Sequence, residues 1–100
     1  MNITTINQDD RIVLKLDGWL DTISSPELGK VVDAITAASA IVLDFEKVEY
    51  IASSGLRQVV ACHRKAKELN AEFSVVNVCT EAMSIFQLTG LDKKLNIQAK

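Results

Sequence analysis

Two adjacent serines followed by a glycine, Ser53 to Gly55, are the residues of this chain whose types and spacing best suit anion binding or covalent modification. An apolar segment precedes them and apolar residues at helical spacing follow, which predicts that they begin a helix. A helix N-terminus has unpaired N–H groups and a positive dipole end, so it favours an anion. A phosphate on Ser54 would add about 1.5 to 2 negative charges there. The pattern is therefore compatible with a modification on Ser54 that switches binding.

A purely structural interpretation of these serines stays open. Serine is a favoured N-cap residue, because its hydroxyl accepts a hydrogen bond from a backbone N–H two or three residues on. The modification hypothesis needs a side chain that an enzyme can reach. Gly55 is expected to leave the backbone beside Ser54 accessible.

No other residues have the spacing of a catalytic or metal-binding site. His63, the only histidine, falls on the apolar side of a predicted helix, so a packed, partly buried imidazole is expected. Cys62 and Cys79 show no CxxC spacing and are expected to be small buried or half-buried thiols. Asp44, on an otherwise apolar strand, is expected on the exposed face of a one-sided sheet. We therefore expect no enzyme, no metal site and no cofactor.

The size and charge of the chain restrict its partners. Its 100 residues predict a single domain over residues 1–100. A net charge of -2 without a dense basic block argues against nucleic-acid binding. No apolar run approaches the roughly 20 residues that span a bilayer, so no direct membrane insertion is expected. The first residues lack the features of a signal peptide, so a cytoplasmic location is expected.

Strand-like and helix-like segments alternate in the order β-β-α-β-α-β-α-β. The predicted strands cover residues 2–8, 11–17, 40–45, 72–78 and 95–98, with a hairpin turn at Asp9-Asp10. The predicted helices run from 25 to about 37, from 54 to 69, and from a cap at Thr80 to just before Gly90. This alternation favours parallel neighbours joined by right-handed crossovers. Polar residues on one face of several strands favour a mixed α/β sheet with helices mainly packed on one face.

The segment before the first helix, residues 18–25, is expected to be a loop. Ser25 suits the N-cap position in front of Pro26. Alternatively, Ser24 and Glu27 form a capping box. Trp19 in this loop is either a core residue or an exposed anchor for a partner, since aromatic residues are enriched at binding hot spots.

The helix over residues 54–69 is predicted to be amphipathic. Its apolar arc contains Leu56, Val59, Val60, Cys62, Ala66 and Leu69. Its opposite side contains Arg57, Ala61, Arg64, Lys65 and Glu68. That cationic outer face is interpreted either as a solvated surface or as a protein-docking surface.

Three stretches carry a family resemblance over nearly the whole chain. They are Gly18 to Asp21, Ile41 to Phe45 with the following Val48, Ile51 and Ser53 to Leu56, and Phe86 to Leu91. They resemble, in order, the G-x-L-D loop, the strand and D-S-S-G-L turn, and the terminal F-x-x-x-G-L of the STAS family. Within that family they resemble the stand-alone bacterial anti-sigma factor antagonists.

The resemblance implies a partner-switching cycle. The serine before the glycine, here Ser54, is phosphorylated in that family by an anti-sigma factor, a serine kinase of the histidine-kinase-type ATPase fold. The unphosphorylated antagonist binds this kinase and releases the sigma factor; phosphorylation breaks the complex, and a separate phosphatase restores it. The implied partner-binding residues are Trp19, Asp21, Thr22, Ser53, Ser54, Gly55, Arg57, Gln58, Ala61 and Arg64.

One position departs from the family pattern. Ala52 stands two places before the serine, where the family usually has an acidic residue. If that acid orients the serine or the kinase's metal, phosphorylation here is slower or depends on a different kinase. Asp21 matches the family loop and is expected near Ser54 in space. The alternative function is a STAS scaffold subunit that is not phosphorylated, such as a stressosome-like component or the cytoplasmic partner of a lipid transporter.

Overall fold

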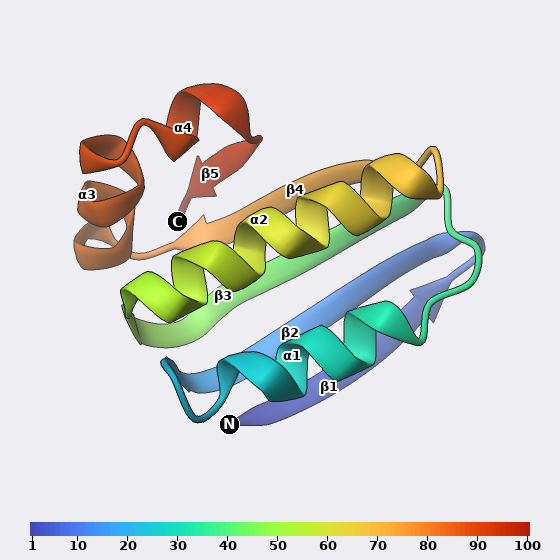
Figure 1. Cartoon of the computed structure of the whole chain (residues 1–100), viewed down its shortest axis with the longest axis horizontal. Coiled ribbons are helices and arrows are strands. Elements are labelled where there is room, and N and C mark those ends of the chain that lie inside the picture. Colours follow the sequence, from blue (N-terminus) through green and yellow to red (C-terminus); the bar gives the residue numbers. More distant parts are fainter.

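The structure, a computed structural model, describes all 100 residues and contains five strands and four helices (Figure 1). The strands are β1 (Asn2–Gln8), β2 (Arg11–Leu20), β3 (Ala40–Ile51), β4 (Glu72–Val78) and β5 (Ile97–Ala99). The helices are α1 (Ser25–Asp33), α2 (Ser53–Glu68), α3 (Thr80–Leu88) and α4 (Leu91–Lys94). The predicted mixed α/β order is confirmed, and the short helix α4 is an addition to it.

The five strands form one sheet in sequence order, β1-β2-β3-β4-β5. β1 and β2 pair antiparallel as the predicted hairpin, whose turn residue Asp9 has a left-handed φ of 59°. The other neighbours, β2 to β5, pair in parallel. Each parallel step needs a crossover, and α1, α2 and the α3–α4 pair supply the three crossovers.

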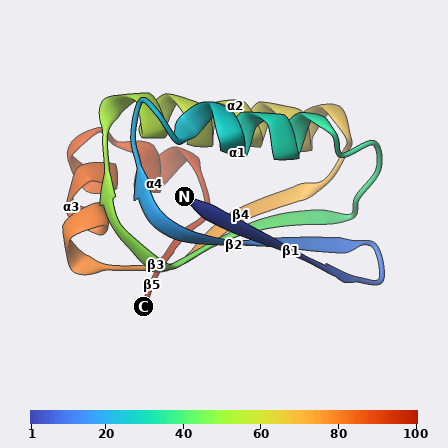
Figure 2. The same ribbon diagram turned by 90° about the horizontal axis from the view of Figure 1, so that it is seen from below.

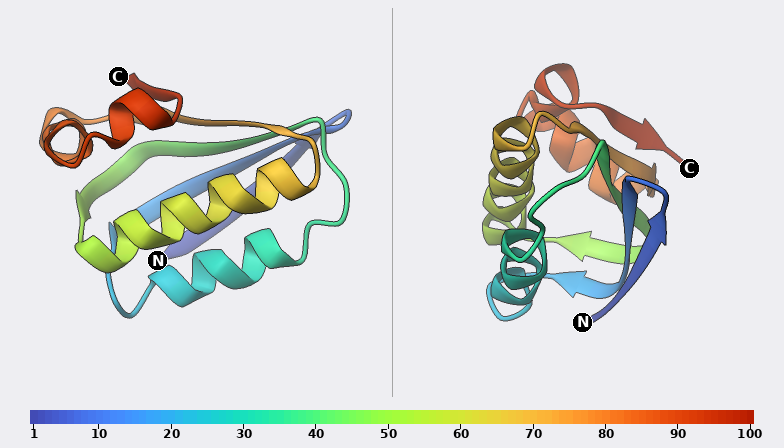
Figure 3. Two further views of the ribbon diagram at one scale, coloured as in Figure 1. Left: turned by 45° about the horizontal axis from the view of Figure 1, so that its top comes forward. Right: turned by 90° about the vertical axis from the view of Figure 1, so that its right-hand side faces the viewer.

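The helices lie on one side of the sheet, with α1 and α2 side by side over its face (Figures 2 and 3). The core between them is a cluster of 20 buried apolar residues drawn from β2, β3, β4 and the helices. Leu14 and Leu16 of β2 alternate with exposed residues, as a strand covered on one face requires. None of the helices is long and apolar enough to cross a membrane.

Strand β3 departs from the one-sided pattern. Residues 41–45 are all buried, and Asp44 is only 8% exposed, so the expected exposure of its side chain is wrong. β3 is the central strand of the sheet, with other strands along both of its edges. The Asp44 carboxylate accepts hydrogen bonds from Asn77 Nδ2 and from the Glu46 backbone N–H, both at 3.0 Å. These partners satisfy a buried polar group, which indicates a structural role.

Several element boundaries differ from the prediction. β2 continues through Gly18 to Leu20, residues expected in a loop, because it pairs with β3 as far as Leu20 opposite Ile51. α1 ends at Asp33 rather than near Ala37. The chain then turns back toward the first hairpin, where the Ser39 N–H donates to the Asp10 carbonyl oxygen.

The ends of α3 were predicted in part. Thr80 is the first helical residue rather than the cap, because Cys79 occupies the N-cap position. Gly90 has the predicted left-handed conformation, with φ of 75°, directly after the C-cap residue Thr89.

Candidate functional site

The carboxyl ends of β2 and β3 curl toward the helices and meet the N-termini of α1 and α2 (Figure 2). The Ala52 N–H donates to the Leu20 carbonyl oxygen at 2.9 Å, which joins the start of α2 to the end of β2. Gly55 is buried at this junction. A Cβ there would lie 2.5 Å from the Leu20 carbonyl oxygen and 2.9 Å from Ile51 Cγ1. The expectation that Gly55 leaves the backbone accessible is therefore wrong: a glycine is needed because two backbone segments approach closely.

No serine caps helix α2. The N-cap residue is Ala52, in an extended conformation with φ of -90° and ψ of 172°, and no side chain accepts a hydrogen bond from the first turn. The first turn also contains no acidic residue. The unpaired N–H groups and the positive dipole end are therefore left without a side-chain acceptor or a compensating carboxylate.

The hydroxyl of Ser54 faces the turn between β2 and α1. Its Oγ lies 3.2 Å from Thr22 Oγ1, within hydrogen-bond distance and in an exposed position. Ser54 is half-buried and Ser53 is exposed. The side chain expected to be modified is thus not sealed inside the protein, and the structure brings residues 22 and 54 together across 32 positions of sequence.

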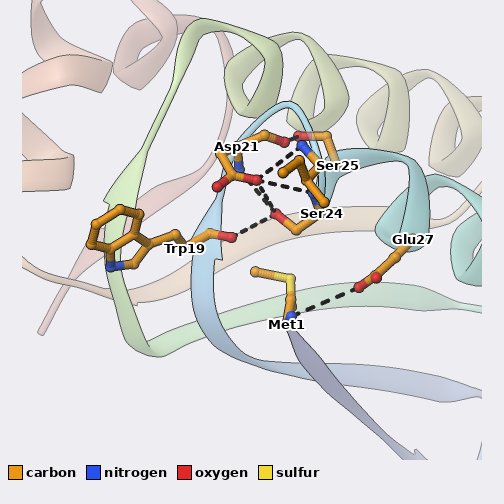
Figure 4. A network of polar contacts seen from close by, with 7 residues as sticks. Met1, Trp19, Asp21, Ser24, Ser25 and Glu27 are labelled. Atoms are coloured by element: carbon orange, nitrogen blue, oxygen red, sulfur yellow. Dashed lines mark hydrogen bonds and ion pairs between the residues drawn. The ribbon is translucent and has the colours of Figure 1, made fainter.

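Asp21 organises the turn that holds Thr22 (Figure 4). Its Oδ1 accepts hydrogen bonds from the backbone N–H groups of Ile23 and Ser24, both at 3.0 Å. The hydrogen bond from the Ser24 N–H is the largest cause that lowers the pKa of the Asp21 carboxyl below its usual value. Ser24 Oγ in turn accepts from the Asp21 N–H at 2.9 Å and donates to the Trp19 carbonyl oxygen at 2.6 Å. The turn is therefore a closed hydrogen-bond network around an ionised carboxylate.

Neither predicted cap hydrogen bond forms at the start of helix α1, although Ser24 is the N-cap residue that the capping-box prediction requires. Ser24 occupies the N-cap position, but its hydroxyl makes no cap hydrogen bond, because it is used in the Asp21 network. Ser25 lies within the helix and its hydroxyl donates to the Asp21 carbonyl oxygen. Glu27 does not complete a capping box; its carboxylate lies 3.9 Å from the terminal ammonium of Met1 (Figure 4). Pro26 does stand in the first turn, as predicted.

Trp19 is exposed, so the first of its two predicted roles, a core residue, is wrong. It is 59% exposed, and its indole points away from the Asp21 turn (Figure 4). Tyr50, its neighbour on β3, is 48% exposed, and the two ring centroids lie 5.5 Å apart with the planes at 57°. Sequence reasoning missed Tyr50 and the 83% exposed Ile23. Their positions in the sequence could have indicated them, because Ile23 directly follows Thr22 and Tyr50 lies just before the predicted serine–glycine turn.

The predicted residues of α2 divide into two groups. Arg57, Ala61 and Arg64 are exposed and follow one side of the helix. Gln58 is half-buried and packs toward α1: a Cβ on Gly29 would lie 3.0 Å from Gln58 Oε1. A helix rises about 1.5 Å per residue, so Arg64 lies roughly 15 Å along the axis from Ser54. The structure therefore assembles Asp21, Thr22 and Ser54 closely, whereas Arg64 lies well away from them.

The histidine and the cysteines lie as expected. His63 is partly buried, with its ring 5.6 Å from that of Phe73, and desolvation, followed by Lys67, lowers the pKa of the imidazole. Cys62 is buried, and burial raises the pKa of its thiol to about 12. Such a thiol is not a nucleophile at neutral pH. Cys79 is half-buried and unpaired.

Comparison with known proteins places the chain in a family. The STAS domain model matches residues 2–100. The anti-sigma-B factor antagonist of Staphylococcus aureus (strain NCTC 8325 / PS 47) is 27% identical over 99 residues, which cover 97% of this chain and 92% of the relative. An anti-sigma factor antagonist from Mycobacterium paratuberculosis superposes with a TM-score of 0.87 at 26% identity, covering 99% of this chain and 86% of that one.

The fold is also that of the anti-sigma factor antagonist SpoIIAA in its unphosphorylated form, with a TM-score of 0.74 at 19% identity over 99% of this chain and 88% of that one. The family model spans all three stretches that carried the resemblance, from the end of β2 to the α3–α4 connection. The chain therefore belongs to the STAS domain family, as those stretches predicted.

Proposed function

We propose that this chain is an anti-sigma factor antagonist, a binding protein rather than an enzyme. Its partner is an anti-sigma factor serine kinase of the histidine-kinase-type ATPase fold, and phosphorylation of Ser54 ends the complex. The names of the Staphylococcus aureus relative and of the Mycobacterium paratuberculosis structure support the antagonist role. The observation that carries the switch is the accessible Ser54 hydroxyl at a helix start without a side-chain cap.

The electrostatics of this helix start suit a switch. A phosphate on Ser54 Oγ would lie at the positive end of α2, where no side chain already occupies the first-turn N–H groups. The fold therefore tolerates the added charge. The Asp21 carboxylate in the adjoining turn is ionised, so the modified surface would carry two like charges. A partner bound over this surface would have to keep both negatively charged groups out of water, which favours dissociation after phosphorylation.

The proposed partner surface extends from the β2–α1 turn to the exposed side of α2. Trp19 provides a large aromatic anchor at one place, and Arg57, Ala61 and Arg64 provide a partly cationic strip at another. Aromatic and arginine side chains are the residues most enriched at binding hot spots. Gly55 contributes by bringing α2 onto β2, since it is buried. A separate phosphatase that acts on phosphorylated Ser54 would complete the cycle.

The proposal is tested with an anti-sigma factor serine kinase from the same organism. Ser54→Asp is expected to abolish binding in calorimetry, because it places a negative charge on the partner surface. Ser54→Ala is expected to bind as the parent does and to stay bound when ATP is added. Mass spectrometry of the parent after incubation with kinase and ATP locates the phosphate, and Ser53→Ala is the matched control. If Ser54→Asp and Ser54→Ala both bind like the parent and respond to ATP like it, the switch hypothesis is wrong.

One residue favours a second function. Ala52 stands two places before Ser54, where the family usually has an acidic residue. A scaffold subunit that is never phosphorylated needs no such acid. Under this alternative, no phosphate is found on any residue after incubation with ATP and the kinase. Transporter genes beside the coding sequence, instead of kinase or sigma-factor genes, would also favour the scaffold.

A further inference from the structure

Ser54 Oγ has one side-chain hydrogen-bond partner, and it comes from another part of the chain. That partner is Thr22 Oγ1, at 3.2 Å. The N-terminus of α2 has no carboxylate, because Ala52 occupies the N-cap position and the first turn contains no acidic residue. The orientation of the Ser54 hydroxyl therefore depends on a neutral hydroxyl from the β2–α1 turn.

Thr22 is held firmly enough to orient a neighbour. Its backbone lies between Asp21 and Ser24, whose mutual hydrogen bonds close the turn around it. The turn is joined to α2 by the Ala52 N–H to Leu20 carbonyl bond and by the close packing of Gly55. Threonine is also β-branched, which restricts its χ1. The hydroxyl of Thr22 is thus presented to Ser54 from a fixed base.

We infer that Thr22 is a positioning residue for phosphorylation of Ser54, a step that rests on the proposed function. The 3.2 Å contact allows either hydroxyl to donate, and the arrangement that we propose for phosphorylation is the one in which Thr22 Oγ1–H donates to Ser54 Oγ and favours one staggered rotamer of that serine. A hydroxyl has two acceptor lone pairs and one proton. Ser54 Oγ therefore keeps one lone pair for the incoming phosphorus and its own proton for release.

The kinase and ATP supply every other group that phosphoryl transfer to Ser54 requires. A lone pair of Ser54 Oγ forms the bond to the γ-phosphorus of ATP. The bond from that phosphorus to the bridging oxygen breaks, and its electron pair leaves with ADP. The Ser54 proton passes to a carboxylate base of the kinase. Thr22 keeps its own proton throughout, so its contribution is orientation and not proton transfer.

The role is tested by removing one oxygen atom. Thr22→Val keeps the shape of the side chain and deletes the hydroxyl, whereas Thr22→Ser keeps the hydroxyl. With the same kinase and ATP as in the test of the proposed function, we expect Thr22→Val to lower kcat for phosphorylation by about 3- to 10-fold, the range of one neutral hydrogen bond. Thr22 also lies on the implied partner surface, so KM and the Kd of the unphosphorylated complex are measured separately, and we expect the loss in kcat to exceed any loss in binding. Thr22→Ser should restore most of the rate.

A second measurement needs no kinase. Three-bond NMR couplings report χ1 of Ser54, and we expect one dominant rotamer in the parent and in Thr22→Ser, and rotamer averaging in Thr22→Val. An unchanged kcat in Thr22→Val overturns the inference and leaves the proposed function standing. An equal loss in kcat and in binding also overturns it, since Thr22 would then be a contact residue. If no phosphate is added to the parent chain, the proposed function fails and the inference fails with it.

Discussion

Two serine pairs stand at the starts of two neighbouring helices, and their hydroxyls have opposite uses. Ser24 and Ser25, at the start of α1, are each 5% exposed, and both hydroxyls are bonded within the Asp21 turn. Ser53 and Ser54, at the start of α2, are exposed and half-buried, with a single side-chain hydrogen bond between them and the rest of the protein. The two pairs differ by one position, since Ser24 is the N-cap residue of α1 and Ser53 is the first helical residue of α2, and they separate into a structural pair and a chemically available pair.

The difference comes from what the preceding backbone offers. At α1, the Trp19 and Asp21 carbonyl oxygens point at the serine hydroxyls and use their protons. At α2, the preceding backbone is used by strand β2, since Ala52 donates to the Leu20 carbonyl oxygen. A serine remains available for modification only where no buried backbone group needs it.

The variant with the largest expected effect disturbs the close approach of α2 to β2. Gly55→Ala adds a Cβ 2.5 Å from the Leu20 carbonyl oxygen, a rigid backbone atom. We expect a loss of about 1 to 3 kcal/mol in the free energy of unfolding, the range of overpacking in a well-packed interior. Urea denaturation measures it.

Gly29→Ala is the matched glycine control for Gly55→Ala. Its Cβ would meet the flexible end of Gln58 at 3.0 Å. Alanine also has the better helix propensity, so we expect the free energy of unfolding to change by less than about 1 kcal/mol. Equal costs at both positions would contradict the close approach of α2 to β2.

The second test compares the serine pairs directly. Ser24→Ala leaves the Trp19 carbonyl oxygen and the Asp21 N–H without their partner, so we expect a loss of about 1 to 3 kcal/mol in unfolding free energy. Ser54→Ala removes one exposed hydrogen bond and should cost less than about 0.5 kcal/mol. Thermal and urea unfolding of both variants give the values. A Ser54→Ala cost as large as that of Ser24→Ala would erase the distinction between the pairs.

The smallest test uses pH. The pKa of Asp21 is lowered in the folded protein, so its ionised form favours folding at pH values above about 3.9, its usual unfolded pKa. This contribution is lost as pH falls through the lower folded pKa. We expect the stability difference between the parent and Asp21→Asn to shrink steadily below about pH 4. Urea unfolding from neutral to acid pH follows it, and a difference that stays constant would show that the carboxylate charge is not what the turn stabilises.

Much of the fold was predictable because it depends on local patterns. The alternation of Leu14 and Leu16 predicted a strand, and helical spacing predicted the buried side of α2. The boundaries that failed depend on distant partners. Gly18 to Leu20 became a strand because β3 continues beside them, and Asp44 is buried because β3 is central. Neither feature can be predicted from the residues near those positions alone.

The candidate site divides in the same way. The sequence by itself determined that a serine–glycine turn begins an amphipathic helix in a STAS domain, because residue spacing and motif are local properties. Only the tertiary structure decided that Thr22 is the partner of Ser54 and that Ser24 is used up in a turn. Both outcomes follow from where β2 and β3 end relative to each other. The Leu20–Ala52 hydrogen bond and the absence of a Cβ on Gly55 set that relation.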